Sequence, residues 1–464
     1  MREPRMEKIF LSGEESLGSD DLKRLRRHAK KVFEKLERKV QNDHNDEKSV
    51  PPRSWVGDEE NNKPSCRSLQ KRYFDQHGFL VIRNFCGTQE VINLKQAMAD
   101  SVRDHWFPEG LCDDDDGEDN NNGTNKGKQQ KVTSFGTDAK SNEARGDPFL
   151  ESADKVSYFA EPTALDAESG SLKQEFRHQN KKLLALCKAG HGLHLPHMFR
   201  NSPPSGVESD DTENGTNNEE SNVHQPFFEY TSSSKMRDLV LSLGYQDPVV
   251  PQSMYIFKNP KVGGVVGSHQ DSTFLFTTPK QTCLGLWLAL DDATLQNGCL
   301  WIRPGSHREP LRRQFLRNPK HDGTADNDEP KLTFSIHHEN PGVTWEGSVP
   351  ESVEVWKDNE EDDAHRCNPS EDPAHDDDDP EPEISSMNFV PVEVEAGDLV
   401  LFCGTLDHFS LPNFSEEQRH TFQLHLVEGP NAGIEWSPSN WLQYESEESE
   451  RNEFLRLLDY VDGT

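Results

Sequence analysis

Six short β-rich segments decide the fold of this 464-residue chain. They are SMYIFK (253–258), STFLFTT (272–278), CLGLWLAL (283–290), CLWIRP (299–304), FVPVEVEAGDLVLFCG (389–404) and HTFQLHLVEG (420–429). Asn-Pro, Gly-Gly, Asn-Gly and Pro-Gly pairs lie between them, and such pairs are turn signals. Many short strands that follow a helical region are typical of an α+β protein built on a β-sandwich or barrel.

Helical patterns precede these strands. Apolar residues recur at three- and four-residue steps over 22–40, and the other face of this predicted helix is basic. We interpret it as a solvated helix docked by its apolar stripe; contact with an acidic insert or partner is the alternative. Further segments read as supporting helices packed on one face of the barrel, with a strand at Phe79–Arg83. The helices are predicted at 68–77, 91–107, 180–190 and 232–244.

Acidic residues outnumber basic residues by 83 to 50, and much of the excess lies in three segments. We expect disordered acidic inserts near 113–145, 203–222 and 357–385, which interrupt one domain over 65–440. Loop insertions cost little free energy, so a solubilising spacer is favoured over a metal store or a docking tail. An N-terminal extension and linker (1–64) and an acidic, helical tail (441–464) complete the predicted organisation.

Composition excludes several classes of protein. A net charge of −33 argues against nucleic-acid binding, because phosphates repel an acidic surface. No apolar run approaches the roughly 20 residues of a membrane helix, and the first residues lack the apolar stretch of a signal peptide. The eight cysteines include no CxxC pair, and the C-terminal DYVDGT is no peroxisomal signal. We expect a monomeric, cytoplasmic protein with free thiols.

A His-x-acid triplet on a strand places two metal ligands on one face. The chain contains five such triplets: His44/Asp46, His269/Asp271, His307/Glu309, His337/Glu339 and His375/Asp377. Only His269/Asp271 lies between a Gly-rich turn, VGGVVGS (262–268), and an apolar segment, STFLF (272–276), which we expect to be a strand. The other four lie in the linker, an insert, a polar loop or, for His307, after a Pro-Gly turn that it would hydrogen-bond. A metal site needs rigid neighbours, so His269/Asp271 is the candidate.

A facial triad needs a second imidazole and leaves three metal positions open. The segment AGDLVLFCGTLDHFS (396–410) is predicted as a strand running into a loop that ends at His408, the candidate third ligand. In the strand that Arg419 opens, polar and apolar residues alternate. Arg419, Thr421, Gln423 and His425 share one face, which suggests a ligand cavity inside the barrel. Arg419 would pair there with a ligand carboxylate, or alternatively form a structural bridge at the strand end.

Taken together, these segments resemble the phytanoyl-CoA dioxygenase family. The motifs are HGFLVIRNF (77–85), QSMYIFKNP (252–260), SHQDSTFLFT (268–277), LGLWLALDDATLQNGCLWIRPGSH (284–307) and GDLVLF (397–402), with His408 and Arg419. The stretch DDATLQNGCLWIRPGSH is the most specific of them, and the resemblance covers about Leu69–Gly429 outside the inserts. It implies a double-stranded β-helix, the jelly-roll or cupin-like barrel.

The resemblance also implies the ligands of the site. His269, Asp271 and His408 would bind Fe(II), which 2-oxoglutarate would chelate through its 1-carboxylate and 2-keto oxygens. Arg419 would hold the distal carboxylate of this co-substrate, with Ser410 beside it. Three more residues match positions that contact 2-oxoglutarate in the family, namely Trp287, Met254 and Lys188. Each has a simpler alternative, a core position for the first two and a solvated helix lysine for the third.

The implied reaction uses O₂ to hydroxylate a C–H bond of a small organic substrate, with release of succinate and CO₂. Asp271 favours hydroxylation, because halogenating relatives lack this carboxylate. Two alternatives stay open: a catalytically silent jelly roll that binds or senses a ligand, and a cupin-type metalloenzyme that does not use 2-oxoglutarate. The sequence does not identify the substrate, including whether it is an acyl-CoA.

Overall fold

The computed structural model describes most of the chain outside the acidic segments. The described residues are 6–11, 16–42, 55–56, 64–106, 150, 156–166, 168–176, 185–186, 225–321, 329–337, 349–350, 352–356, 389–443 and 454–459. The acidic residues of the three predicted inserts lie outside them, as does Lys188.

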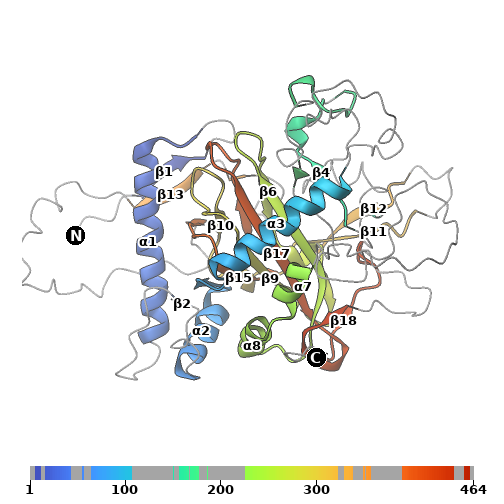
Figure 1. Ribbon diagram of the computed structural model, residues 1–464. Coiled ribbons are helices and arrows are strands. Elements are labelled where there is room, and N and C mark those ends of the chain that lie inside the picture. The colour runs from blue at the N-terminus through green and yellow to red at the C-terminus, as the bar shows by residue number, and fades with distance from the viewer. Residues whose placement is uncertain are drawn as a thin grey trace, which may run out of the picture.

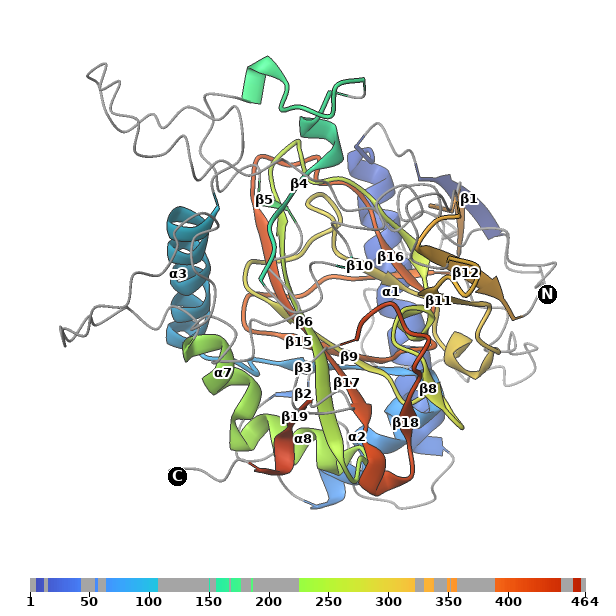
Figure 2. The ribbon, with the colours of Figure 1, turned by 90° about the vertical axis from the view of Figure 1, so that its right-hand side faces the viewer.

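Two sheets form the barrel, as the jelly-roll prediction requires. The larger sheet has seven strands, in the order β19 (Leu455–Arg456), β6 (Pro248–Lys258), β17 (Arg419–Glu428), β9 (Leu284–Ala289), β15 (Leu399–Cys403), β3 (Phe79–Arg83) and β2 (Trp55–Val56). The smaller sheet has four, in the order β14 (Val390–Val392), β10 (Leu300–Ile302), β16 (His408–Ser410) and β7 (Val266–His269). From β6 to β17 the chain passes repeatedly from one sheet to the other, which confirms the double-stranded β-helix (Figure 2).

Short paired elements extend the barrel. The strand pairs are β1 (Met6–Phe10) with β13 (Ser352–Trp356), β11 (Arg313–Arg317) with β12 (Leu332–Ile336), β8 (Thr277–Thr278) with β18 (Glu435–Trp436), and β4 (Phe159–Ala160) with β5 (Ala185–Leu186). The 3₁₀ turns are η1 (Pro162–Ala164), η2 (Gln174–Phe176), η3 (Asp271–Thr273), η4 (Ser306–Arg308), η6 (Pro430–Ala432) and η7 (Leu457–Asp459).

Helices cover the outside of the larger sheet. They are α2 (Pro64–His77), α3 (Thr88–His105), α7 (Gln225–Ser232) and α8 (Ser234–Ser242). Figure 1 shows α3 and α7 lying across the long strands β6 and β17. The apolar face of β17 meets α7, where the Phe227 and Phe422 rings lie 4.9 Å apart. Because this side of β17 is sealed by aromatic packing, its polar side faces the interior of the barrel.

The predicted basic helix is α1 (Ser19–Asn42), and its apolar stripe is buried. Leu25 and Leu36 belong to the same hydrophobic core as the barrel strands. Figure 1 shows α1 along one side of the molecule, with β1 and β13 beside it. Arg26 on its exposed face pairs with Glu393 at 2.8 and 2.9 Å. The N-terminal region therefore packs onto the barrel, and no described helix is long and apolar enough to cross a membrane.

Three local predictions are wrong. STFLF does not form a strand, because the Asp271 carbonyl accepts hydrogen bonds from the backbone N–H groups of Phe274 and Leu275 and curls the chain. Ala185 and Leu186, predicted within a helix, pair as β5 with β4. In the expected helical tail, the described residues 441–443 and 454–459 contain no α-helix; Leu455–Arg456 form strand β19 and Leu457–Asp459 the 3₁₀ turn η7. Strand pairing outweighed local propensity at β5 and β19, whereas local hydrogen bonds formed the turn at Asp271.

Candidate metal and co-substrate site

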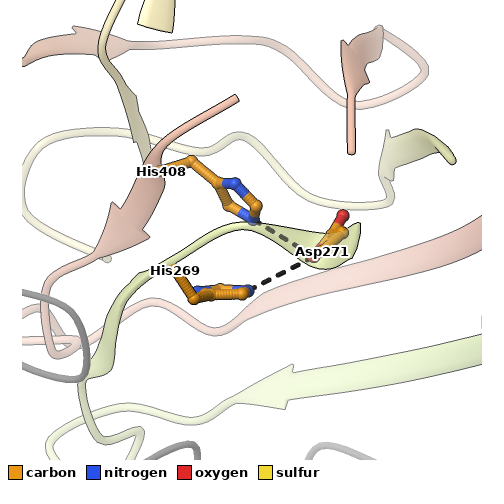
Figure 3. A group of neighbouring side chains, drawn as sticks. All are labelled: His269, Asp271 and His408. Carbon is orange, nitrogen blue, oxygen red and sulfur yellow. Dashed lines mark ion pairs between the residues drawn. The ribbon is translucent and has the colours of Figure 1, made fainter. Parts of the chain in front are cut away.

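Three candidate metal ligands converge between the two sheets (Figure 3). His269 ends β7, Asp271 opens η3, and His408 begins β16, which pairs with β7 so that the two histidines face each other in register. Asp271 Oδ1 lies 3.3 Å from His269 Nε2 and 3.6 Å from His408 Nε2. All three side chains are buried, and their ligand atoms lie within 4.8 Å of one another.

Backbone hydrogen bonds fix which nitrogen of each imidazole faces the centre. His269 Nδ1 lies 2.8 Å from the Gly267 carbonyl, and His408 Nδ1 lies 3.0 Å from the Leu406 carbonyl. A carbonyl only accepts, so each Nδ1 carries the proton and each Nε2 keeps its lone pair. Burial, and next the neighbouring His269 imidazole, lowers the pKa of His408 to about 4, so its imidazole is neutral near pH 7. Two neutral nitrogens and one carboxylate oxygen are the ligand set that suits ferrous iron with open positions.

The position of Asp271 depends on an irregular backbone. The sequence predicted a continuous strand, but the chain leaves β7 after His269 and turns into η3, which brings Asp271 back toward both imidazoles. Gly285 on β9 leaves room for it, because a Cβ at Gly285 would lie 3.0 Å from Asp271 Oδ2. Burial alone would raise the pKa of Asp271, but the imidazoles of His425, His408 and His269 together hold it well below the usual value. The carboxylate is therefore ionised and available to a cation.

His425 on β17 holds the second oxygen of the Asp271 carboxylate. Its Nε2 lies 3.2 Å from Asp271 Oδ2, so the imidazole donates to one oxygen and leaves Oδ1 facing His269 and His408. The sequence placed His425 on the polar side of this strand but gave it no role. An imidazole that fixes a ligating carboxylate is a common support of metal sites.

His425→Ala is expected to weaken Mn(II) or Fe(II) binding by about 10- to 100-fold, because Asp271 loses the donor that orients it. His420→Ala is the matched control, since His420 lies on the opposite face of the same strand and bonds the Tyr255 hydroxyl. Calorimetric titration with Mn(II) measures both. Equal metal affinity in His425→Ala and wild type would show that Asp271 needs no such support.

A buried charge network ties the two ligand-bearing strands together. Asp407, beside His408, accepts hydrogen bonds from Ser268 Oγ at 2.7 Å, Arg312 Nη2 at 2.6 Å and Arg303 Nη2 at 3.0 Å. Burial would raise the pKa of Asp407, but the two guanidinium groups lower it overall. Since Ser268 precedes His269, this network holds β7 against β16 next to the metal ligands. The sequence analysis did not single out any of these residues.

The rejected triplet His307/Glu309 has a structural role. Glu309 pairs with Arg303 at 2.5 Å. His307 was expected to hydrogen-bond the Pro-Gly turn, but its Nε2 lies 3.1 Å from the carbonyl of Asp75 in α2. This triplet therefore connects a helix to the barrel and lies outside the metal cluster.

Arg419 lies inside the barrel, at the opposite end of the polar side of β17 from His425. Its side chain is buried, and its guanidinium lies 5.4 Å from the centre of the Trp287 ring. It donates to the Gly298 carbonyl at 2.9 Å and to Thr421 Oγ1 at 3.3 Å. Trp287 and Met254 both pair in register with Gln423, so the three side chains share the inner face of the larger sheet. The structure thus brings Trp287 and Met254 onto the face that carries Arg419.

A second buried cation lies beside Arg419. Lys258 pairs with Arg419 in register, and its Nζ donates to Ser410 Oγ at 2.8 Å. Glu161, between β4 and η1, accepts a hydrogen bond from Gly264 N at 3.0 Å. Burial raises the pKa of Glu161 to about 7, although the Gly264 bond and the charges of Lys258 and Arg419 act in the opposite direction. Neither Lys258 nor Glu161 was predicted from the sequence; a lysine inside the apolar run SMYIFK was the available signal.

Glu161 is expected to make folding stability depend on pH. Its pKa is about 7 in the folded protein against 4.5 ordinarily, so the folded state holds the proton more tightly. Its contribution is therefore full below about pH 4.5 and falls as pH rises toward about 7. Glu161→Gln keeps the acceptor for Gly264. As pH rises from 5 to 8, the melting temperature of this variant should increase by at least about 2 °C relative to that of wild type. The exposed Glu168→Gln serves as control, and identical pH profiles for Glu161→Gln and wild type would contradict the assignment.

The chain is similar to known proteins over most of its length. Residues 74–421 match the family model described as phytanoyl-CoA dioxygenase (PhyH). A phytanoyl-CoA dioxygenase of Arabidopsis thaliana is 31% identical over 375 residues, which is 81% of this chain and 92% of that protein. Phytanoyl-CoA dioxygenase domain-containing protein 1 of Mus musculus is 31% identical over 378 residues, 81% and 94% of the two chains. Among solved structures, the non-heme alpha ketoglutarate dependent epimerase SnoN aligns at 11% identity and a TM-score of 0.42, over 85% of this chain and 100% of that one.

Proposed function

Because the chain belongs to the phytanoyl-CoA dioxygenase family, we propose that it hydroxylates a C–H bond of a small organic substrate. Membership agrees with the class expected from the motifs, a non-haem dioxygenase that uses iron and 2-oxoglutarate. In the proposed reaction O₂ is consumed, 2-oxoglutarate becomes succinate and CO₂, and the substrate gains a hydroxyl group.

The observation that carries the proposal is the convergence of His269, Asp271 and His408 in one buried cluster. Their nitrogen and oxygen donors fit ferrous iron, and three protein ligands leave positions for a chelating co-substrate and O₂. Iron bound there would supply the redox chemistry that activates O₂. The protein contributes fixed donors, because the Gly267 and Leu406 carbonyls lock both imidazoles and His425 locks the carboxylate.

The proposed co-substrate pocket lies along the polar side of β17, where Arg419 would bind the distal carboxylate of 2-oxoglutarate. Planar guanidinium groups bind carboxylates through two parallel hydrogen bonds, so Arg419 is suited to this task. Trp287 and Met254 would wall the chain of the co-substrate, and Ser410 would donate to the same carboxylate. Lys188, the fifth proposed contact, lies outside the described residues.

Aromatic rings beside the histidines would keep water from the reacting centre. The Phe402 ring centre lies 4.6 Å from that of His408, and the Phe274 ring centre lies 6.1 Å from that of His269. Exclusion of water strengthens the electrostatic interactions in the site and limits side reactions. A pocket closed in this way suits oxidation of an unactivated C–H bond.

The test is anaerobic calorimetry with Fe(II) and 2-oxoglutarate, followed by measurement of succinate after O₂ and a metabolite extract are added. We expect 2-oxoglutarate to bind only when metal is present, and succinate to form with a hydroxylated product. A protein that binds Fe(II) but neither binds nor consumes 2-oxoglutarate would overturn the proposal. A protein that binds 2-oxoglutarate and yields no succinate with any extract would instead be a silent binding module.

A further inference from the structure

Lys258 is a buried lysine that joins the two sheets of the barrel. It is the last residue of β6 in the larger sheet, and only 2% of its surface is exposed. Its Nζ reaches across to β16 of the smaller sheet and donates to Ser410 Oγ at 2.8 Å. It also donates to the carbonyls of Leu411 at 2.6 Å and Gly264 at 2.9 Å. A buried ammonium with three hydrogen bonds occupies a defined position rather than a solvated one.

Two glycines make the passage for this side chain. A Cβ at Gly263 would lie 2.4 Å from Lys258 Cγ, and a Cβ at Gly298 would lie 2.6 Å from Lys258 Cδ. Either substitution would therefore push the lysine out of place. Gly298 also offers its carbonyl to Arg419 at 2.9 Å, so one turn positions both buried cations. The close approach of glycine backbone on two sides indicates that the chain is shaped around Lys258.

The bond between Lys258 and Ser410 makes the serine oxygen an acceptor of the ammonium group. An ammonium group only donates, so Ser410 Oγ must accept from Lys258 and direct its own proton elsewhere. Among the residues that the structure describes, no protein group accepts that proton. Ser410 lies two residues after His408 on β16, and side chains two apart on a strand share a face. The hydroxyl proton of Ser410 is therefore available on the strand face that also carries His408, a candidate metal ligand.

We propose that Lys258 is a positioning residue that makes Ser410 a hydrogen-bond donor to the distal carboxylate of the co-substrate. This inference rests on the proposed function, since it assumes that 2-oxoglutarate binds beside Arg419 and Ser410. Lys258 acts through Ser410, whereas Arg419 binds the carboxylate itself. A serine whose oxygen already accepts from an ammonium has one lone pair engaged and keeps its proton for the ligand, so it meets an anion as a donor.

The charges around this end of the pocket are consistent with that role. Lys258 and Arg419 supply two positive charges, and Glu161 supplies one carboxylate, which Gly264 holds through its backbone N–H. Gly264 also accepts from Lys258, so the carboxylate and the ammonium are fixed by the same residue.

A double-mutant cycle on 2-oxoglutarate affinity tests the inference. The proteins are wild type, Lys258→Met, Ser410→Ala and the double variant, each loaded with Mn(II) and titrated calorimetrically without O₂. Methionine keeps most of the apolar stem and removes the ammonium. We expect each single variant to bind 2-oxoglutarate about tenfold or more weakly, as for loss of a hydrogen bond to a charged group. The double variant should bind about as weakly as Ser410→Ala, because Lys258 acts through the serine.

Lys261→Met is the matched control, because Lys261 lies in the same turn but is exposed and pairs with Glu416 at the surface. Mn(II) affinity should stay unchanged in all variants, which separates the co-substrate pocket from the metal cluster. If Lys258→Met fails to fold, Lys258→Gln, whose side chain is uncharged and one bond shorter than lysine, takes its place with the same expected loss.

The outcomes separate the two proposals. Wild type that binds Mn(II) but not 2-oxoglutarate overturns the proposed function. Wild type that binds 2-oxoglutarate, with Lys258→Met of equal affinity, overturns only the role of Lys258. Additive losses in the double variant would likewise show that Lys258 acts on the ligand independently of Ser410. A lower melting temperature with unchanged affinity would mean that Lys258 only joins the sheets.

Discussion

His408→Ala is expected to abolish Fe(II) binding at micromolar metal and, with it, the formation of succinate. His408 supplies one of only two nitrogen donors in the cluster, and its Nε2 faces Asp271 Oδ1 at 3.6 Å. With one nitrogen and one carboxylate left, a tridentate site becomes bidentate. The loss should exceed the roughly 10- to 100-fold cost of removing an outer support such as His425. Calorimetry with Fe(II) or Mn(II) measures affinity, and succinate release measures turnover.

His337→Ala is the control for His408→Ala. His337 belongs to another His-x-acid triplet of the sequence, but it is exposed and stacks on Phe276 at 5.6 Å between ring centres. It should bind metal as wild type does. Full metal affinity in a folded His408→Ala protein would show that the described triad is not the metal site.

Arg419→Met is expected to raise the KM for 2-oxoglutarate by about 100-fold or more while Mn(II) affinity stays unchanged. The guanidinium is buried against Trp287, so its removal would leave the distal carboxylate buried without its main cation. Breaking a buried ion pair costs about 3–5 kcal/mol, which corresponds to this range. Methionine fills much of the vacated volume, which limits the effect on folding. Initial rates of succinate formation over a series of 2-oxoglutarate concentrations give the KM.

Arg308→Met is the control for Arg419→Met, since Arg308 is exposed and donates to the Gln76 carbonyl. Arg419→Lys adds a sharper comparison. Lysine keeps the charge but cannot form two parallel hydrogen bonds, so its KM should lie between those of wild type and Arg419→Met. An Arg419→Met enzyme with the wild-type KM would show that the guanidinium does not bind the distal carboxylate of 2-oxoglutarate.

Periodicity and motif context were sufficient for the main architecture. The stripe of α1, the strand Phe79–Arg83 and the alternation of β17 follow from apolar spacing, which the structure reproduces. The alternation along β17 also indicated which side faces the interior of the barrel, because its apolar side packs against α7. Context also selected His269/Asp271 from five triplets, and the structure places no other described group in a comparable cluster.

Other features could not be read from local sequence. STFLF has the β-branched and aromatic residues of a strand, yet the chain turns at Asp271. This turn brings the carboxylate to the imidazoles. Three supporting contacts join residues that are far apart in the chain. His425 contacts Asp271 across 154 positions, Asp407 contacts Ser268 across 139, and Lys258 contacts Ser410 across 152. Only strand pairing across the barrel brings such partners together.

The sequence by itself therefore determined most of the elements, the polar face of β17 and the His269/Asp271 pair of the candidate metal cluster, because these depend on spacing within a few residues. The tertiary structure decided how those ligands are held. It set the proton positions on His269 and His408 through backbone carbonyls, and it placed the Lys258 ammonium where Ser410 Oγ accepts from it. Hydrogen-bond direction depends on which donors and acceptors meet in space, and that is fixed only when the two sheets close on each other.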